Sequence, residues 1–463
     1  MTRVWRNLLL AGSDVAAISS AGALAYWIWA LPMRQQAPAM YLDLAPLLVL
    51  FAAGYAGAGL YPGFGIGPVQ TLRRLTIVTT FGFLLLAAIT FALKLPHLYS
   101  RVTFLLALLL SLVFVPFGRL ALFRVARRWQ WWPEPVAVIG TGRRAAHAIR
   151  SIQNSSHLGY RPAAVLRSEA GASASGDLEG VPIVGGVDKA SDLAAAGIRI
   201  AFLEIDPTQA RAVLETLQQD FQQVILLREF DDLPVEGLQV RNLGTLVGVE
   251  YTNNLLRSAN QAAKRVLDLL LAGSALIVAF PLIVLAAILV KLIDGGPMFF
   301  RQTRVGRAGR RFSIPKIRTM RRDADERLEE YLKANPAMRE EWTTRYKLRD
   351  DPRLISGVGR LLRRFSIDEL PQLWTVLKGD MSLVGPRPLP DYHLEKFSTS
   401  FVEFRQRVRP GITGLWQIMV RSDGGTEDQE AFDTYYIRNW SVWFDLYLLG
   451  RTIAAVASGR GAD

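Results

Sequence analysis

Hydrophobic residues dominate the first quarter of the chain, where four long apolar stretches are separated by short polar segments. Each stretch approaches the roughly 20 residues that a helix needs to cross a ~30 Å hydrocarbon core. The pattern therefore predicts a four-span transmembrane region over residues 1–130. The predicted spans run from Leu8 to Pro32, Leu44 to Tyr61, Leu75 to Leu93 and Val102 to Gly118.

Arginines at the ends of these stretches predict how the spans are oriented. Arg3 precedes the first span, Arg73 precedes the third, and Arg119 begins a basic segment after the fourth. Because cytoplasmic loops carry an excess of Lys and Arg, we expect the N-terminus and everything after Arg119 to face the cytoplasm. Asp14 lies inside the first span, where a position near the membrane interface is favoured over a polar contact between helices.

A fifth apolar stretch, from Val266 to Ile293, differs from the others because basic residues flank both of its ends. Lys264 and Arg265 precede it, and the segment from Gly295 to Arg322 holds nine Lys and Arg residues and no acid. Both ends are therefore expected at the cytoplasmic face. Phe280-Pro281 supplies the break of a re-entrant helix over about 266–293, because proline removes a helix hydrogen bond. A kinked helix that crosses the membrane is the alternative.

Short apolar strands alternate with helical segments between the membrane part and the fifth stretch. This alternation predicts a small, doubly wound, Rossmann-like α/β domain over residues 133–250. After the first strand, Gly140 and Gly142 have the G-x-G-x-x-A spacing that lets a backbone approach a pyrophosphate. Two interpretations remain, a nucleotide-binding turn or a corner that only joins strand and helix, and the second is favoured. The expected strands are 136–139, 163–166, 181–184, 198–205 and 224–227.

Composition narrows the chemistry of the 463-residue chain, which is 50% hydrophobic with a mean hydropathy of +0.19. It has no cysteine, which excludes disulfides, thiol nucleophiles and zinc-thiolate sites. Its four histidines are scattered singly, so a histidine metal cluster or a Ser-His-Asp triad is not expected. The net charge of +13 suits nucleic acid, anionic lipid or phosphorylated molecules, and the membrane stretches favour the last two. We therefore expect membrane lipid as a partner and no nucleic acid.

Three basic side chains lie in local sequences that set them apart from the many other arginines of this region. Lys316 and Arg318 lie in an otherwise apolar strand from Ile314 to Met320. Each Lys or Arg near the membrane surface contributes roughly 1 kcal/mol to binding of anionic lipid. Lipid binding explains less well why these two basic residues lie in an apolar strand. Arg387 has a proline on each side, which fixes its backbone, and a rigidly held arginine suits phosphate.

Adjacent carboxylates, Asp368 and Glu369, open a predicted helix that ends at Gly379. The positive end of a helix lowers the pKa of a carboxylate and attracts anions. Helix capping by Ser366 or by Asp368 is the structural alternative. Capping alone explains one acid and not both, so the pair is a candidate catalytic site.

From about residue 260 to its end, the chain resembles the bacterial sugar transferases, also named monotopic phosphoglycosyl transferases. Several long motifs in one order carry the resemblance. With its spans and middle domain, the chain is similar to the large members of the family, the undecaprenyl-phosphate galactose and glucose phosphotransferases. The matching segments are Lys316-Ile317-Arg318, Arg363 to Leu377, Gly379 to Pro388, Arg409 to Gln417, and Tyr435 to Leu448.

The resemblance implies transfer of a hexose 1-phosphate from a UDP-hexose to undecaprenyl phosphate, with Mg²⁺ as cofactor and release of UMP. It implies that Asp368 attacks phosphorus and forms a covalent aspartyl-phosphosugar, chemistry that a carboxylate can perform. Glu369 would hold Mg²⁺, which prefers carboxylate and phosphate oxygens. Asp445 matches a family acid that contacts substrate, orients a base or caps a helix. The resemblance assigns the diphosphate to Lys316, Arg318, Arg363 and Arg387.

The expected architecture has a membrane α-helical N-terminal bundle, the Rossmann-like α/β middle domain and an α/β phosphoglycosyl transferase domain. This last domain covers residues 254–463 and includes the re-entrant helix. We expect a multi-pass enzyme of the bacterial inner membrane with its catalytic domain in the cytoplasm. Its product would start a lipid-linked glycan such as an exopolysaccharide, O-antigen or capsule, and a homodimer is a further expectation.

Two other functions fit parts of the sequence. A membrane-tethered sugar-nucleotide dehydratase or epimerase would use Gly140 and Gly142 with the pair Tyr392 and Lys396, although about 250 residues separate turn and pair. A non-enzymatic membrane scaffold would bind anionic sugars or lipid and show no turnover. Release of UMP from a panel of UDP-sugars distinguishes the three functions.

Overall fold

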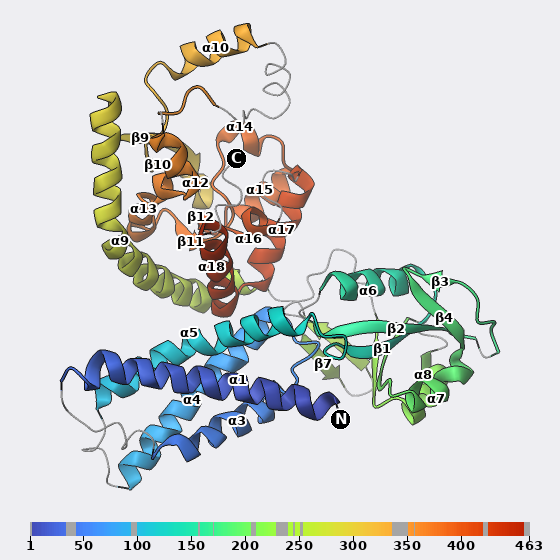
Figure 1. Cartoon of the computed structure of the whole chain (residues 1–463). Coiled ribbons are helices and arrows are strands. Elements are labelled where there is room, and N and C mark those ends of the chain that lie inside the picture. The colour runs from blue at the N-terminus through green and yellow to red at the C-terminus, as the bar shows by residue number, and fades with distance from the viewer. Residues whose placement is uncertain are drawn as a thin grey trace. The chain divides into compact units, whose positions relative to one another are not determined.

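The chain folds into two compact units, residues 1–231 and 232–463. The computed structural model describes residues 2–33, 43–93, 100–155, 158–169, 171–204, 210–227, 239–243, 246–250, 253–335, 351–355, 357–419 and 425–457. The first unit joins the apolar N-terminal helices to an α/β sheet, and the second contains the fifth apolar stretch and everything after it (Figure 1). The division falls inside the predicted middle domain, so a hairpin of strands β7 (Gln239–Leu243) and β8 (Leu246–Glu250) belongs to the second unit.

Among the described residues of the first unit, three helices are long and apolar enough to cross a membrane. They are α1 (Thr2–Ala25), which continues as a π-helix over Tyr26–Ala30, α4 (Pro68–Ala92) and α5 (Arg101–Ala126). The second predicted span is shorter than expected, because the apolar helix there covers only Ala45–Gly57. It consists of a 3₁₀ turn and α3 (Leu48–Gly57), and the chain leaves it through Gly59 in a left-handed conformation.

Asp14 and Arg119 form a buried ion pair between α1 and α5. Arg119 donates from Nε to Oδ1 at 2.9 Å and from Nη2 to Oδ2 at 2.6 Å, and the Tyr61 hydroxyl donates to Oδ2 at 2.9 Å. A buried charge is stable only when it is paired in this way. The polar contact between helices, the alternative for Asp14, is therefore confirmed, and its position near the membrane interface stays a prediction.

A six-stranded mixed sheet with the order β3-β4-β2-β1-β5-β6 forms the rest of the first unit. All neighbouring strands are parallel except β3 and β4. Alternating side chains of β1 fill two cores, with α6 on one face and α7 and α8 on the other (Figure 1). The predicted strands are confirmed. The elements are β1 (Glu134–Ile139), α6 (Arg143–Asn154), β2 (Tyr160–Arg167), β3 (Asp177–Leu178), β4 (Val181–Gly186), α7 (Ala190–Ala195), β5 (Ile200–Leu203), α8 (Ala210–Asp220) and β6 (Gln223–Leu226).

Helix α9 (Ser258–Asp294) is the longest element of the second unit, with 37 residues. It remains helical through Pro281, but it bends near its middle, as Figure 1 shows. The predicted break is therefore a bend and not an interruption. Apolar side chains before Pro281 are exposed, with Ile277 77% and Val278 80% accessible to solvent.

Both halves of α9 pack against the same α/β body. In the N-terminal half, Lys264 lies 2.6 Å from Asp445, and Asp268 accepts a hydrogen bond from Ser382 Oγ at 3.0 Å. In the C-terminal half, Ile283, Ala286 and Val290 join the hydrophobic core that includes Ile317, Ile355 and Leu362. A straight spanning helix would carry one half away from this body.

The α/β body is built from short elements that converge beside α9. A hairpin of β9 and β10 leads, through α12 and a 3₁₀ turn η7, to α13, and β11 pairs in parallel with β12. The bounds are β9 (Phe299–Val305), η6 (Arg307–Gly309), β10 (Arg311–Ile317), α10 (Ala324–Ala334), α12 (Val358–Arg364), η7 (Ile367–Glu369), α13 (Gln372–Lys378), β11 (Ser382–Val384), α14 (Asp391–Leu394), α15 (Thr399–Arg405), β12 (Gly411–Thr413), α16 (Leu415–Met419), α17 (Thr426–Asn439) and α18 (Val442–Ala457).

Candidate active site

The adjacent acids Asp368 and Glu369 lie in η7, a single 3₁₀ turn before α13. Helix α13 begins only at Gln372, after Pro371, so the expectation that the two acids open the α-helix itself is wrong. Ser366 precedes them in a left-handed conformation (φ 52°), and its side chain makes no capping hydrogen bond. No side chain caps α13 either. Helix capping therefore does not account for the two acids.

Glu369 is paired with a lysine from the neighbouring hairpin. Lys316, on β10, places its Nζ 2.5 Å from Oε1 of Glu369. Burial raises the pKa of the Glu369 carboxyl, but the positive charges of Lys316 and Arg387 outweigh burial and hold this pKa below its ordinary value. Glu369 is therefore an anion within a positively charged environment.

Asp368 has a different environment, although it is the next residue. Its side chain is buried, and burial together with the charge of Glu369 raises its pKa to about 6. Lys316 and Arg363 act in the opposite direction but do not cancel this effect. The expectation that a helix start lowers the pKa of both acids is therefore wrong for Asp368, because burial dominates. At pH 7 roughly nine in ten Asp368 carboxyls are ionised.

Arg363, at the end of α12, completes the positive side of the site. Its Nε donates to Thr319 Oγ1 at 3.0 Å, and Asp351 and Asp368 lie close enough to raise its pKa. Burial is the larger effect and lowers the pKa of Arg363 overall. Thr319 is buried and fixes the direction of the guanidinium group. Its only signal in the sequence is its place at the end of the strand that carries Lys316.

Arg387 is exposed, and the prolines on each side of it are buried. Its backbone carbonyl accepts a hydrogen bond from Arg405, whose Nε lies 3.0 Å from Asp433 Oδ2. Arg405 and Asp433 are both buried, on α15 and α17. This ion pair supports the loop that presents Arg387. Sequence reasoning missed both residues, because the contacts join segments with no common local pattern.

Arg318 lies outside this cluster. It is buried and pairs with Asp294 at the end of α9, and it also donates to the carbonyl of Pro297 at 2.7 Å. These contacts fasten the end of α9 to the end of β10. These contacts use Nε and Nη1, while Nη2 has no hydrogen-bond partner among the described residues, so the role of Arg318 at a diphosphate stays a prediction.

Asp445 is also held in a structural cluster. It is buried and accepts hydrogen bonds from Lys264 Nζ at 2.6 Å, Tyr436 Oη at 2.7 Å and Trp440 Nε1 at 3.0 Å. Among its described partners there is neither Asp368 nor a cation of the site around it. Of the expected roles, a substrate contact is therefore not supported, and Asp445 instead fastens the N-terminal half of α9.

The two acids could bind Mg²⁺ only if oxygens of water and of a bound phosphate completed its coordination. Within the described ranges, no group of three or more His, Cys, Asp and Glu side chains could hold a metal ion. Mg²⁺ often needs no more than one or two carboxylates, because water and substrate phosphates complete its coordination. Glu369 provides an ionised carboxylate at the surface of the cluster, although Lys316 now occupies one of its oxygens. The donor set therefore fits the ion together with a phosphate ligand.

The glycine turn of the first unit is filled by a carboxylate of the protein itself. Glu204, directly after β5, accepts hydrogen bonds from the backbone N–H groups of Gly142, Arg144 and Ala145 at 3.1, 3.1 and 2.9 Å. These N–H groups at the start of α6 are the donors that a pyrophosphate would need. A strand-to-helix corner is therefore the interpretation of Gly140 and Gly142 that the geometry supports.

The residues of the alternative enzyme site are distributed over the two units. Tyr392 lies exposed on α14 in the second unit, and Gly140 and Gly142 belong to the first. Glu204 occupies the N–H groups of the glycine turn that a dehydratase or epimerase would use for its dinucleotide.

Comparison with known families gives two matches. The family described as bacterial sugar transferase matches residues 259–459, which include every residue of the cluster around Asp368. A family described as CoA-binding domain matches residues 59–200, which include the glycine turn. The contacts of Glu204 do not fit a CoA diphosphate at that turn.

Two of the similar curated proteins match most of this chain, and a third matches about half of it. The chain is 33% identical over 368 residues to the UDP-galactose-lipid carrier transferase of Erwinia amylovora, covering 78% of this chain and 76% of that protein. It is 31% identical over 371 residues to the undecaprenyl-phosphate galactose phosphotransferase of Salmonella typhimurium, covering 79% and 76%. The exopolysaccharide production protein ExoY of Sinorhizobium fredii is 44% identical over 222 residues, which are 48% of this chain and 97% of that protein.

Proposed function

Because this chain belongs to the bacterial sugar transferase family, we propose that it transfers a hexose 1-phosphate from a UDP-hexose to undecaprenyl phosphate. The chain is accordingly an enzyme of the phosphoglycosyl transferase class. Its product would start a lipid-linked polysaccharide. The names of the relatives support a carrier lipid and a sugar donor as the two substrates.

The environment of Asp368 is the observation that carries the mechanism. A buried carboxylate without an ion pair in the described part of the chain, and with a pKa of about 6, is ionised at neutral pH but poorly stabilised by solvent. Such a carboxylate is suited to act as a nucleophile. Glu369, one residue later, is already engaged by Lys316 and is less suited to attack.

The proposed reaction has two steps at one phosphorus atom. In the first, a carboxylate oxygen of Asp368 forms a bond to the phosphorus attached to the sugar. The bond from that phosphorus to the bridging oxygen breaks, and UMP leaves with this oxygen and its electron pair. In the second, an oxygen of undecaprenyl phosphate attacks the same phosphorus, the bond to Asp368 breaks, and the carboxylate is restored.

Three cations bind and orient the diphosphate in this proposal. Lys316, Arg363 and Arg387 come from three different segments, and each contributes to the electrostatics of Asp368 or Glu369. Arginine and lysine in such positions stabilise the charge on the phosphoryl oxygens during transfer. When bound, Mg²⁺ would be held by Glu369 and substrate phosphate oxygens and would neutralise part of this charge.

The surface around the site supports a position at the inner face of the membrane. The exposed face of α9 is apolar, and both halves of α9 pack on the catalytic body, which is consistent with a helix that enters the membrane and returns. Leu361, Phe365 and Trp374 are partly exposed on α12 and α13, close in sequence to the two acids. We therefore include a re-entrant α9 and a cytoplasmic active site at headgroup depth in the proposal.

Intact-protein mass spectrometry tests this function. The full chain is mixed with UDP-glucose or UDP-galactose and Mg²⁺ without lipid phosphate. We expect the protein mass to rise by one hexose phosphate, with UMP in the supernatant and the modified peptide containing Asp368. Turnover with lipid phosphate but no trapped intermediate would favour direct attack by the lipid, and no UMP release with any UDP-sugar would favour the scaffold.

A further inference from the structure

The segment that follows Arg387 carries two aromatic rings that have no role in the proposed reaction. Tyr392 and His393, both exposed on α14, have ring centroids 4.7 Å apart. The backbone N–H of Val305 donates to the carbonyl of Leu389 at 3.0 Å. This hydrogen bond fastens the segment between Arg387 and α14 to the end of β9.

Arg304, near that end of β9, is half-buried and lies close to Arg387 and to the rings. Burial lowers the pKa of Arg304, Tyr392 raises it, and Arg387 lowers it. Burial also lowers the pKa of His393, and the charge of Lys396 lowers it next. Arg304 and Arg387 act on His393 in the same direction, so its imidazole is mainly neutral at pH 7. These side chains therefore form one surface of cations and rings beside the catalytic cluster.

The charge of this surface is available to a ligand. No described acid forms an ion pair with Arg304 or Arg387. Asp391, the acid at the start of α14, lies 3.4 Å from Arg311 instead. Glu369, whose pKa Arg387 lowers, is already paired with a lysine. Two neighbouring arginines without an acidic partner suit phosphate oxygens, to which arginine can donate two hydrogen bonds at once.

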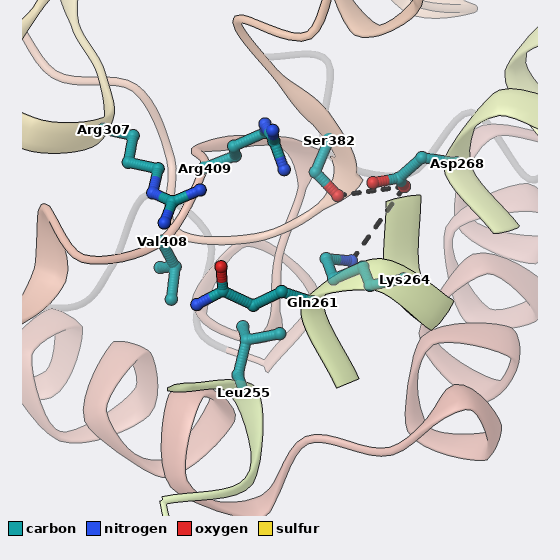
Figure 2. Close-up of a pocket in the computed structure, with 8 residues that line it drawn as sticks. All are labelled: Leu255, Gln261, Lys264, Asp268, Arg307, Ser382, Val408 and Arg409. Atoms are coloured by element: carbon teal, nitrogen blue, oxygen red, sulfur yellow. Dashed lines mark hydrogen bonds and ion pairs between the residues drawn. The ribbon is translucent and has the colours of Figure 1, made fainter. Parts of the chain in front are cut away.

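The cations beside the N-terminal half of α9 differ in this respect. Figure 2 shows Lys264 and Ser382 directed toward Asp268, in a pocket that Arg409 also lines. Burial and neighbouring cations lower the pKa of Arg409, and the charges of Asp268 and Asp380 oppose them. Acids of the protein itself therefore lie beside these cations, and we do not expect them to bind the donor.

The surface around α14 suits a water-soluble ligand better than a lipid. Among the described residues 375–418, Tyr392 is the one large apolar side chain that is exposed. Leu361 and Trp374, on α12 and α13, are exposed on the segments next to the two acids and were assigned above to the membrane. The segment after Arg387 instead offers charge and aromatic rings, which favours the sugar donor over the carrier lipid.

We propose that Arg304, Tyr392 and His393 form the subsite for the nucleoside half of the donor, an inference that rests on the proposed function. Arg387 holds the diphosphate next to Asp368, and Arg304 binds the phosphate that leaves with the nucleoside. The exposed ring of Tyr392 stacks on the base, because every base has an aromatic face. The neutral imidazole of His393 accepts a hydrogen bond from the ribose or the base.

Equilibrium binding of UMP to the detergent-solubilised full chain tests this subsite without depending on turnover. Tyr392→Ala should weaken UMP binding about tenfold, because the base loses its stacking partner. Tyr392→Phe keeps the ring and should bind UMP as the wild type does. Inorganic pyrophosphate has no base, so its binding should not change in Tyr392→Ala. Tyr392 is exposed, and its variants should keep the wild-type melting temperature.

Arg304→Gln tests the phosphate part of the subsite, with Arg301→Gln as its matched control. Arg301 is exposed on the same strand, and its distance of three positions places it on the opposite face. We expect Arg304→Gln to weaken binding of UMP and of pyrophosphate about tenfold. Arg301→Gln should change neither. Equal weakening by the two variants would refute the role of Arg304, because a general charge effect would then suffice.

Kinetics separate this inference from the proposed function. Tyr392→Ala should raise the KM for the UDP-sugar with little change in kcat. If it raised the KM for undecaprenyl phosphate instead and left UMP binding unchanged, α14 would serve the lipid, and the subsite would be refuted. Unchanged UMP binding in both Tyr392→Ala and Arg304→Gln would refute the subsite alone, provided that the wild type turns over. A wild type that neither binds UMP nor releases it from any UDP-sugar would overturn the proposed function and the subsite with it.

Discussion

Lys316 holds Glu369 through an ion pair of 2.5 Å, whereas Asp368, the preceding residue, is buried and has no ion pair in the described part of the chain. Two chemically similar acids therefore have pKa values that move in opposite directions, down for Glu369 and up to about 6 for Asp368. Two carboxyl groups whose pKa values differ in this way commonly perform different tasks in one reaction.

Asp368→Asn is expected to abolish UMP release and the trapped phosphosugar-enzyme, because the amide has no negative charge with which to attack phosphorus. The exposed Asp380 lies in the same segment, and Asp380→Asn is the matched control that should keep near-normal turnover. Radiolabelled UDP-sugar, followed by gel separation of the protein, measures the intermediate. A labelled Asp368→Asn protein would exclude Asp368 as the nucleophile.

The rate of UMP release should fall as the pH is lowered through about 6. Below this pKa Asp368 is protonated and cannot attack, so the rate should drop about tenfold per pH unit on the acid side. The kcat/KM for UDP-sugar, measured from pH 8 to pH 5 at saturating Mg²⁺, gives the profile. A rate that is flat down to pH 5 would contradict the raised pKa or the role of Asp368.

Asp368→Asn should also stabilise the protein at pH 7. The folded-state pKa of Asp368 is raised from 3.8 to about 6, so ionisation of the buried carboxyl costs up to about 3 kcal/mol of folding free energy at neutral pH. The wild type regains this stability as the pH falls through 6 towards 4, because the folded state binds the proton more tightly. Thermal unfolding in detergent should show a higher Tm for the variant at pH 7 and a smaller difference near pH 4.5.

Glu369→Gln should leave the nucleophile in place and weaken metal binding. The amide retains the size of the side chain but loses the anionic oxygen that Mg²⁺ prefers, so half-maximal rate should require about tenfold more Mg²⁺. Glu403 is exposed on α15, and Glu403→Gln serves as the control. A rate that does not recover at any Mg²⁺ concentration, with the control unaffected, would instead assign Glu369 a role in the chemical step.

Cysteine labelling tests the membrane arrangement of α9, and the native chain has no cysteine to interfere. Single cysteines at Arg257 and Gly309, which flank α9, should react with an impermeant reagent from the same face of inverted inner-membrane vesicles. Reaction from opposite faces would show a crossing helix. Replacing Pro281 with leucine should straighten α9, favour the crossing form and reduce activity.

The sequence was sufficient to predict the two acids and the cations around them, because motif spacing and local composition identify Lys316, Asp368 and Arg387. It could not distinguish Lys316 from Arg318, which occupy the same apolar segment. Their contacts differ because Lys316 lies within β10 and pairs with Glu369, whereas Arg318 follows β10 and pairs with Asp294 at the end of α9. Contacts of this kind depend on tertiary structure and not on local pattern.

Local sequence patterns also failed to predict which charged side chains are buried. A helix start predicted a lowered pKa for Asp368, and the packing around η7 reversed it. Asp14 and Arg119 share no local pattern, and their pairing across 105 residues of sequence buries both side chains between α1 and α5. The parallel strands of the first unit were predicted well because each has a continuous apolar run bounded by turns.

Helix α9 is fastened to the same α/β body near both of its ends, by Asp445 at Lys264 and by Arg318 at Asp294. An ordinary spanning helix adapts to a thinner or thicker bilayer by changing its tilt. A helix attached at two points to the same domain cannot change its tilt independently of that domain. The helix and the domain would therefore have to move together relative to the bilayer. The height of the catalytic acids above the lipid tails would then be set by the distance between the two clamps, and it would stay constant as the composition of the membrane changes.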